Sequence, residues 1–348
     1  MTDHDRIRIG FIGAGGIARQ RHLPNLRDMP GVEFTAVSNR SEASSRQAAD
    51  EWAIPAIETD WRRLVERDDV DAVFIGTWPA THRAMSIAAL EAGKHVFCQA
   101  RLACDLAEAQ AMADAAGRHR DLVAMTCPPP HRMPWEPWIR RQLEAGILGE
   151  LRNVQLQSIS GANLGPITFR ERVELSGKQI LQVGIWAETL IAWLGEYETL
   201  AAVTATPIRT KRDDAGQPYT IAIPQIVHVH GRLANGAAIT ELHTGVSLHG
   251  HTNHVLLEGS EATLRVDAMQ RVLLGKPGEE LAEVDVPTEL QRDWQVEQDF
   301  IDAVRAARRG ASWQVDPDFH EALRYMRKVE AIHRSDETGQ RVRLAQVI

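Results

Sequence analysis

Glycines near the start of the chain have the spacing of a phosphate-binding turn. The stretch Gly13-Ala14-Gly15-Gly16-Ile17-Ala18 fits G-x-G-x-x-[GA] and follows an apolar segment at 7–12. Gly13 permits a tight turn, and Gly15 lacks the Cβ that would keep a pyrophosphate away from the backbone. A helix starting after the turn would offer N–H groups to the phosphates. The pattern therefore predicts dinucleotide binding by Gly13, Gly15, Gly16, Ile17 and Ala18, although other α/β proteins also contain such turns.

Residues 39 and 40 bear on which dinucleotide is expected. About twenty residues beyond the turn, NAD-binding folds often carry an Asp or Glu that binds the ribose 2′-hydroxyl. This chain has Asn39 and Arg40 there. Asn39 has no charge to repel a 2′-phosphate, and Arg40 could pair with one. The expected cofactor is NADP or NAD, with NADP favoured. The alternative is that Arg40 lies in solvent or stacks on adenine.

A predicted helix at about 178–194 carries residues that could act on a substrate. Lys178, Gln182 and Trp186 are spaced by four residues and would share one helix face. A desolvated Lys178 would have a lowered pKa and could act as acid or base. The alternative is a solvent-exposed lysine at the helix start. Trp186 could stack on a ring substrate or fill core space.

Histidines gather on a predicted hairpin. Asn235-Gly236 separates two β-type runs, at 225–233 and 237–246. With a two-residue loop, His230 would face Glu241 and His228 would face His243, all on one side of the sheet. Such a set could hold zinc or iron. A polar outer face or an interface explains the same residues, and no metal is assigned.

Strands and helices alternate over the first part of the chain. Apolar or β-branched runs at 33–38, 71–77, 94–98 and 122–126 read as strands, with helices expected at 44–52, 83–92 and 105–116. Asp105 is a candidate N-cap and Gly117 a candidate stop. This alternation predicts a doubly wound parallel sheet. Thr77, Trp78, Pro79 and His82 follow the strand at 71–77, at the edge where open α/β sheets bind ligands.

Three consecutive prolines at 128–130 mark a change of pattern. They cannot continue a helix or a central strand, so a domain junction is expected there. A short helix is predicted at 138–145, β-rich segments dominate from 151, and amphipathic helices are predicted at 294–308 and 319–333. The predicted domains are 1–126, which binds the dinucleotide, and 127–348, which binds substrate and forms oligomers.

The composition excludes several classes of protein. The 348 residues are 44% hydrophobic and 25% charged, as in ordinary globular proteins. The net charge of −8 and the lack of a basic arm argue against nucleic acid as a partner. The N-terminus has no apolar signal region, and no stretch is long enough to span a membrane. Three cysteines have no zinc spacing and would leave one thiol unpaired, which favours a reducing cytoplasm.

Together these segments resemble the glucose–fructose oxidoreductase / inositol dehydrogenase (Gfo/Idh/MocA) family. The resemblance covers nearly the whole chain. It is carried by the segments at 9–18, 70–77 leading to His82, 89–96, 143–150 and 329–335, the last followed by Gly339. It implies an N-terminal Rossmann domain and a C-terminal α/β domain with a large, mostly antiparallel open sheet. That sheet often makes the dimer contact, so a homodimer or homotetramer is expected.

The resemblance also implies NAD(P)-dependent oxidoreduction of a sugar-like or hydroxylated small molecule. Thr77, Trp78, Pro79, His82 and Gln99 would lie near the nicotinamide, with Arg101, Gln182 and Trp186 near the substrate. The family's Glu-Lys-Pro is Gln99-Ala100-Arg101 here, and its helical Asp and His are Gln182 and Trp186. None of these replacements is a general base near neutral pH.

Two explanations of this departure remain open. In the first, the protein is an enzyme with a relocated acid–base set, for which Lys178 is the candidate catalytic residue. A variant of this explanation is an enzyme that uses transient hydride transfer for an elimination or rearrangement. In the second, the protein is an inactive dinucleotide-binding regulator or sensor.

Overall fold

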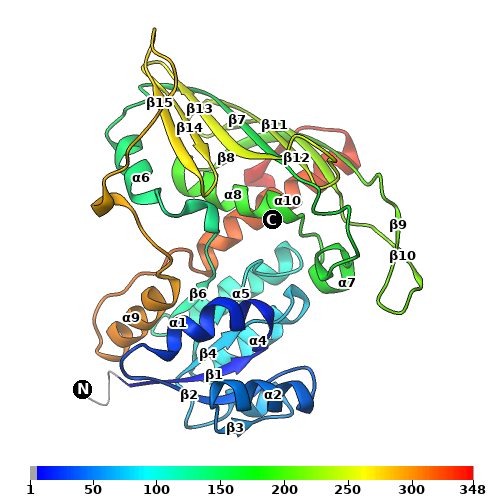
Figure 1. The fold of residues 1–348 in the computed structure, drawn as a ribbon, viewed down its shortest axis with the longest axis vertical. Helices are drawn as coiled ribbons and strands as arrows, with labels where there is room; N and C mark the ends of the chain where they lie inside the picture. The colour runs from blue at the N-terminus through cyan, green and yellow to red at the C-terminus, as the bar shows by residue number, and fades with distance from the viewer. Residues whose placement is uncertain (1–5, 348) are drawn as a thin grey trace. The chain divides into compact units, whose positions relative to one another are not determined.

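The computed structural model describes residues 6–347, with Leu181 described by its backbone alone. Two compact units are present (Figure 1). Unit 1 contains the chain up to Pro128 together with Gln295–Leu323, and unit 2 contains Pro129–Trp294 and the chain from Arg324 onward. The division predicted from the sequence, 1–126 and 127–348, differs because it assigns 295–323 to the second domain. The prediction about a signal segment concerns the N-terminus and lies largely outside the described residues.

Unit 1 is built on a parallel sheet. The order across this sheet is β3-β2-β1-β4-β5-β6, and each neighbouring pair runs parallel. The strands are β1 (Ile7–Ile12), β2 (Val32–Ser38), β3 (Ala56–Ile57), β4 (Ala72–Ile75), β5 (His95–Cys98) and β6 (Ala124–Thr126). The doubly wound parallel sheet predicted from the alternating pattern is confirmed.

Several helices of unit 1 begin at residues that favour a helix N-terminus, such as a capping side chain or a proline in the first turn. They are a π-helical turn (Ala18–His22), α1 (Leu23–Arg27), α2 (Glu42–Trp52), α3 (Trp61–Val65), α4 (Pro79–Glu91), α5 (Leu106–Arg118), α9 (Val296–Arg308) and the start of α10 (Phe319–Thr338). Asp105 caps α5 by accepting a 2.9 Å bond from Glu108 N, as predicted. The predicted stop at Gly117 is wrong, since α5 continues through it. Helix α4 begins earlier than predicted because Pro79 suits the first helical turn.

Helix α9 joins unit 1 through an aromatic core. The Phe74 and Phe97 rings stack with centroids 4.6 Å apart, and Phe300 of α9 meets Phe74 edge-on at 5.2 Å. Phe300 is fully buried. Burial of such rings contributes both area and favourable edge contacts. This packing explains why a segment so late in the sequence completes the first unit.

Unit 2 contains an open sheet in which most neighbouring pairs are antiparallel, as the resemblance implied. The order is β16-β15-β14-β13-β7-β12-β11-β8-β17, and the β12–β7 pair runs parallel. Its strands are β7 (Leu151–Ile159), β8 (Tyr197–Ala205), β11 (Ile226–Leu233), β12 (Ala238–Thr244), β13 (Thr252–Gly259), β14 (Thr263–Asp267), β15 (Arg271–Gly275), β16 (Ala282–Glu283) and β17 (Val342–Arg343). A separate hairpin pairs β9 (Thr210–Arg212) with β10 (Pro218–Thr220).

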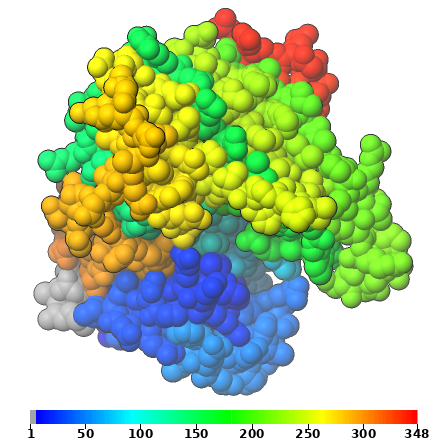
Figure 2. All heavy atoms as spheres, turned by 45° about the horizontal axis from the view of Figure 1, so that its top comes forward, coloured from blue at the N-terminus to red at the C-terminus, as the bar shows by residue number. Residues whose placement is uncertain are grey.

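The helices of unit 2 cover one face of this sheet, and the other face is open. Helices α8 and α10 lie against one face (Figure 1), while the opposite face comes to the surface, green to yellow, in Figure 2. The helical segments are η3 (Pro130–Arg132), α6 (Glu136–Glu144), η4 (Phe169–Glu171), α7 (Val173–Ser176), α8 (Leu181–Leu194), η5 (Thr288–Leu290), most of α10, and η6 (Leu344–Gln346). Alternation along β11 and β12 follows these two environments, with buried and exposed side chains in turn.

Within residues 6–347, no helix is both long and apolar enough to cross a membrane. Cys98, Cys104 and Cys127 form no disulfide with one another.

Candidate functional site

The glycine turn joins β1 to its helix through a short series of backbone bonds. Gly13 N donates to Ser38 O at 2.9 Å, and Gly15 N donates to Gly13 O at 2.8 Å. Gly13 has φ +86°, and a Cβ there would lie 2.7 Å from Thr77 Cγ2 and 2.9 Å from the Gly76 carbonyl carbon. Only glycine tolerates both this backbone conformation and this close approach. Gly13 therefore shapes the turn.

Gly15 and Gly16 differ from Gly13 because they border open space. A Cβ at either position would meet no heavy atom of the described chain within 4 Å. Helical structure starts at Gly16, and Ala18 is buried within the first turn. The first N–H groups of a helix have no intrahelical acceptor and carry the positive end of its dipole. An uncovered backbone at this point has the features needed to bind a diphosphate, so the residues fit a dinucleotide.

Asn39 and Arg40 take different positions beside the turn. The Asn39 side chain accepts a 2.8 Å bond from Ala14 N and donates one of 2.8 Å to Ser44 O. It thus braces the turn against the start of α2. Arg40 is exposed, and its guanidinium carbon lies 5.4 Å from the centre of the Trp78 ring. Its charge is available on the surface of unit 1 next to an aromatic face.

The residues after β4 start helix α4. Thr77 Oγ1 accepts a 2.7 Å bond from Thr81 Oγ1, and Trp78 is the N-cap residue before Pro79. His82 is completely buried, and burial lowers its pKa. Its Nδ1 lies 3.0 Å from Arg101 O, and its Nε2 lies 3.2 Å from Thr77 O. His82 therefore ties the chain after β4 to the chain after β5, where Arg101 lies.

Gln99 is part of a buried polar network that the sequence did not reveal. Its Oε1 accepts a 2.9 Å bond from His22 Nε2, while His22 Nδ1 contacts Glu297 on α9. Asn25 also donates to Glu297, at 2.9 Å. His22 and Glu297 are nearly inaccessible. This network fixes the orientation of Gln99 from within unit 1.

Lys178 precedes the observed helix α8 and does not form its start as predicted. Helix α8 starts at Leu181, after Gly177 with φ +60°, so the predicted shared face of Lys178, Gln182 and Trp186 is wrong. The ammonium of Lys178 pairs with Glu330 at 2.9 Å, and its side chain is 43% exposed. It is a partly solvated ion pair in unit 2.

Gln182 and Trp186 do lie one turn apart on α8. Trp186 is fully buried and donates a 2.7 Å bond to Asn253 Oδ1. The His131 ring lies 5.0 Å from Trp186, and its Nε2 is 3.0 Å from Asn253 Nδ2 and 3.2 Å from the Gln182 amide. Trp186 is thus packed and hydrogen-bonded within unit 2, and Gln182 belongs to the same polar cluster.

The four residues considered as possible metal ligands, to which no metal was assigned, are divided between the two faces of the sheet. The prediction that His230 faces Glu241 and His228 faces His243 is wrong by one residue, because Val229 pairs with Glu241 and Val227 with His243. The loop contains three residues, 234–236, between Leu233 N and Ala237 O, which bond at 2.9 Å. Glu241 and His243 are therefore buried, whereas His228 and His230 are exposed. No group of three or more ligating residues occurs among residues 6–347.

The buried half of that set joins a cluster that includes Lys328 of α10. Both Glu241 oxygens lie 2.7 Å from Lys328 Nζ, and Tyr197 OH donates to the same carboxylate at 2.7 Å. His243 Nε2 lies 2.9 Å from Glu241 Oε2. All four side chains are buried. Sequence reasoning missed Lys328, since an amphipathic helix pattern gives no sign that one lysine faces inward.

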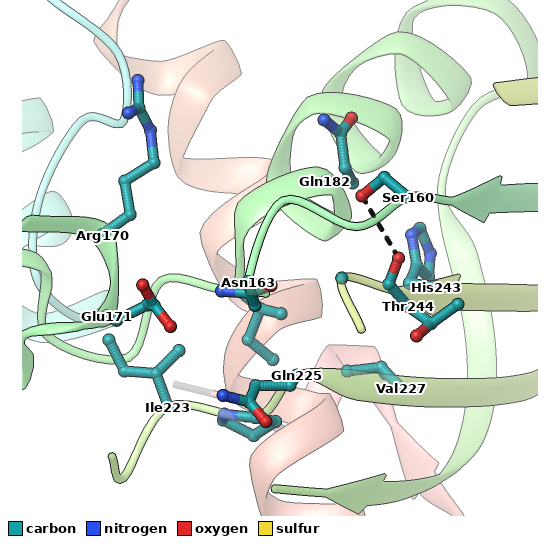
Figure 3. A pocket seen from close by; sticks show the side chains of 13 residues that line it. Ser160, Asn163, Arg170, Glu171, Gln182, Ile223, Gln225, Val227, His243 and Thr244 are labelled. Carbon is teal, nitrogen blue, oxygen red and sulfur yellow. Dashed lines mark hydrogen bonds between the residues drawn. The ribbon is translucent and has the colours of Figure 1, made fainter. Parts of the chain in front are cut away.

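A pocket opens beside this cluster, entirely within unit 2 (Figure 3). Its wall combines the chain after β7, the η4 turn, the start of α8 and the ends of β11 and β12. It is lined by Ser160, Asn163, Arg170, Glu171, Ile180, Gln182, Ile223, Pro224, Gln225, Val227, His243, Thr244 and Gly245. Gln182 and His243 are thus brought to the same pocket, which the sequence did not predict.

A protein-family model matches the first part of the chain. Residues 7–126 match the Gfo/Idh/MocA model, described as an oxidoreductase family with an NAD-binding Rossmann fold. The similarity to the Gfo/Idh/MocA oxidoreductase family is established for this segment of the chain. The match covers β1 to β6, and with them the glycine turn.

Two relatives of the chain have names that specify a sugar or a sugar derivative. A dTDP-3,4-didehydro-2,6-dideoxy-alpha-D-glucose 3-reductase of Streptomyces violaceoruber is 31% identical over 188 residues, which cover 54% of each chain. A levoglucosan dehydrogenase of Pseudarthrobacter phenanthrenivorans is 25% identical over 286 residues, covering 74% of this chain and 73% of that one. The chain spans about half the length of the first of these relatives in the alignment.

Solved structures share the fold of this chain over nearly its whole length. A levoglucosan dehydrogenase in complex with NADH and L-sorbose matches with a TM-score of 0.85 at 20% identity, covering 98% of this chain and 100% of that one. At this identity the likeness establishes the fold.

Proposed function

We propose that the protein is an NAD(P)-dependent oxidoreductase acting on a sugar-like or hydroxylated small molecule. The observation that carries this proposal is the uncovered backbone at Gly15 and Gly16, at the start of a helix, within a domain that matches an NAD-binding family model. The sugar reductase and the levoglucosan dehydrogenase among the relatives support the class of substrate.

The cofactor's diphosphate would lie over the first helical turn. Backbone N–H groups of Gly16, Ile17 and Ala18 would supply donors there, while Gly15, whose own N–H bonds to Gly13 O, lacks a side chain that would cover them. When bound, the nicotinamide supplies a hydride acceptor or donor. The protein's part is to bind, to orient and to exclude water.

The adenosine end would lie near Asn39 and Arg40. Asn39 braces the turn and places no negative charge beside the ribose, while the Arg40 guanidinium can pair with a 2′-phosphate or stack on adenine. This arrangement supports NADP over NAD.

Thr77, Trp78, Pro79, His82 and Gln99 are proposed to line the nicotinamide side. Burial lowers the pKa of His82, and its ring nitrogens face backbone carbonyls, so its role is to hold the segments at 77 and 101 in place. The His22 contact orients Gln99. Arg101, Gln182 and Trp186 are proposed to shape the substrate site, and Lys178 stays the acid–base residue predicted from the sequence.

Cofactor binding followed by turnover tests the proposal. Purified protein is titrated with NADPH and NADH by nicotinamide fluorescence, and then assayed with both oxidised cofactors against sugars and polyols, including levoglucosan and inositol. Turnover of any member supports the enzyme. Binding without net turnover, but with hydrogen–deuterium exchange at a substrate carbon, indicates transient hydride transfer. Binding with neither result indicates a sensor, and absence of binding rejects the whole proposal.

We also propose a homodimer or homotetramer formed through the open face of the unit 2 sheet. Val203 is 69% exposed there, and His228 and His230 on β11 are exposed as well. Light scattering of Val203→Glu beside the unchanged protein tests this surface. Loss of the oligomer supports it, and an unchanged mass contradicts it.

A further inference from the structure

A buried polar network in unit 1 ends at the partly exposed side chain of Gln99. The side chains of His22 and Glu297 are 3% and 1% exposed, and they contact each other through Nδ1 and Oε1. Asn25 Nδ2 donates to the second oxygen of Glu297 at 2.9 Å. On the other side of the His22 ring, Nε2 lies 2.9 Å from Gln99 Oε1. All four residues belong to unit 1.

The partners of His22 determine which ring nitrogens carry protons. A carboxylate and an amide oxygen can only accept hydrogen bonds. Since Nδ1 faces the Glu297 carboxylate and Nε2 faces the Gln99 oxygen, both nitrogens donate. His22 is thus the cationic partner of Glu297 in a buried ion pair. Breaking either contact would leave a buried charge or polar atom unsatisfied, so the pair holds the Gln99 oxygen in place.

The amide nitrogen of Gln99 is left for another partner. It bonds no atom of residues 6–347, and it is not among the buried atoms that lack a partner, so solvent reaches it. An amide nitrogen offers two N–H donors. Because the oxygen is committed to His22, the amide cannot turn over without losing that bond. Gln99 therefore presents donors rather than an acceptor at the surface of unit 1.

Gln99 lies at the edge of the sheet where dinucleotides bind. The strand order β3-β2-β1-β4-β5-β6 reverses between β1 and β4, and ligands of such sheets bind outside the carboxyl ends of the strands at this point. Gln99 follows β5, and its backbone N–H donates to Ile75 O at the end of β4 at 2.9 Å. The glycine turn serves the half of the sheet around β1 and β2. The half around β4 and β5 is left for the nicotinamide nucleotide.

His22 belongs to the same helical segment as the glycine turn. It ends the π-helical turn Ala18–His22, which directly follows the proposed phosphate-binding residues. Such π-helical turns are rare and are frequently found at functional sites. A small cavity is lined by His22 together with Gly13, Ala18 and Gly76. One short segment therefore contacts both the turn and Gln99.

We propose that the buried His22–Glu297 pair holds Gln99 so that its amide nitrogen donates to the carboxamide oxygen of a bound nicotinamide. His22, Asn25 and Glu297 are then positioning residues that act through Gln99. The proposal rests on the NAD(P) binding proposed above. A bond to the carboxamide restricts rotation of the nicotinamide ring, and so determines which face of the ring is presented for hydride transfer.

Two substitutions of His22 separate positioning from stability. His22→Gln keeps a donor near Nε2 for Gln99 but leaves Glu297 without its ionic partner. His22→Asn keeps a donor near Nδ1 for Glu297 but loses the bond to Gln99. Tm should therefore fall more in His22→Gln, while NADH affinity stays within about threefold of the unchanged protein there and falls about tenfold in His22→Asn. If affinity follows Tm instead, the network is merely structural and the proposal is overturned.

A substitution of Gln99 identifies the part of the cofactor that it contacts. Gln99→Met removes the amide and keeps the length of the side chain, and Gln110→Met at an exposed position of α5 is the matched control. Each folded variant is titrated calorimetrically with NADH, NADPH and ADP-ribose, which lacks the nicotinamide. Gln99→Met should weaken NADH and NADPH about tenfold and ADP-ribose less than about twofold. Equal weakening of ADP-ribose, or unchanged NADH affinity, overturns the contact.

Histidine ¹⁵N spectra test the network without any cofactor. At neutral pH His22, assigned from His22→Asn, should show protons on both ring nitrogens, and a single N–H overturns the proposed pair. The titrations also separate the two proposals. Nucleotide binding that is unaffected by both His22→Asn and Gln99→Met rejects the positioning of Gln99 alone. Absence of nucleotide binding by the folded, unchanged protein rejects the proposed function, and this inference with it.

Discussion

The Lys328–Glu241 pair gives the sharpest prediction about the stability of unit 2. Both side chains have 0% exposure in their ion pair, with Nζ 2.7 Å from each carboxylate oxygen. Lys328→Met removes the ammonium and keeps a long apolar chain in its place. Glu241 would then be a buried carboxylate with bonds from Tyr197 and His243 alone.

Two arguments give the same magnitude for the unfolding free energy lost in Lys328→Met. Removing one partner of a buried ion pair typically costs about 3–5 kcal/mol, because the other charge is left uncompensated. Independently, the pKa of Glu241 is about 2 in the folded protein against an ordinary 4.5, a difference worth about 3 kcal/mol. Lys328→Met should therefore lose about 3 kcal/mol or more of unfolding free energy at pH 7.

The unfolding free energy should change with pH in a direction that can be measured. A carboxylate with a lowered folded pKa stabilises the protein above the unfolded pKa of 4.5, and this contribution is lost as the pH falls from 4.5 towards 2. The unchanged protein should lose about 3 kcal/mol across that window from Glu241. Lys328→Met should lose much less there. Adding Glu241→Gln to Lys328→Met should restore part of the stability at pH 7, because the unpaired charge is then gone.

Urea unfolding followed by far-ultraviolet circular dichroism measures these differences. Lys178→Met is the matched control: Lys178 also pairs with a glutamate, at 2.9 Å, but its side chain is 43% exposed. Such a pair is worth at most about 1 kcal/mol. If the two lysine variants lose the same free energy, the argument that burial makes the Lys328 pair critical is refuted.

Other predictions concern the cofactor and the acid–base group. Gly15→Val should weaken NADPH binding at least tenfold without changing Tm, because its side chain enters open space, whereas Gly13→Ala should lower Tm through backbone strain and contact with Thr77; equal effects on Tm would contradict this. Arg40→Ala should weaken NADP more than NAD in fluorescence titrations, and equal weakening would reject the 2′-phosphate contact. If Lys178 is the acid–base residue, Lys178→Met should lower kcat at least tenfold with cofactor affinity unchanged; full activity would remove it from the mechanism.

The fold of unit 1 could be predicted because its signals are local. Continuous apolar strands such as 71–77 alternate with helices, and the glycine turn marks the first crossover. The packing of α9 on the sheet of unit 1 could not be predicted, since it depends on the contacts of Phe300 with Phe74 and Phe97. Nothing in the amphipathic pattern of α9 says which sheet it covers.

The histidine hairpin shows how one residue changes a site. Asn235-Gly236 suggested a two-residue loop, but Gly236 has φ +93° within a three-residue loop. Because side chains alternate along a strand, this shift moves Glu241 and His243 away from His228 and His230. The four residues therefore cannot meet on one face, and Glu241 and His243 instead form a buried carboxylate–histidine pair.

The surroundings of Lys178 and Lys328 could not be predicted without the tertiary structure. Lys178 fitted a helical spacing, but the helix begins at Leu181. The contact between Lys328 and Glu241 spans 87 positions in the sequence, and only the packing of α10 on the sheet brings them together. Types and spacing of residues cannot reveal such a contact.

Titration of the purified chain with NADPH and NADH tests the central claim most directly. The account predicts saturable binding of at least one of them, seen as enhanced nicotinamide fluorescence, and its loss in Gly15→Val with an unchanged Tm. No saturable binding of either cofactor, oxidised or reduced, by folded protein would contradict it.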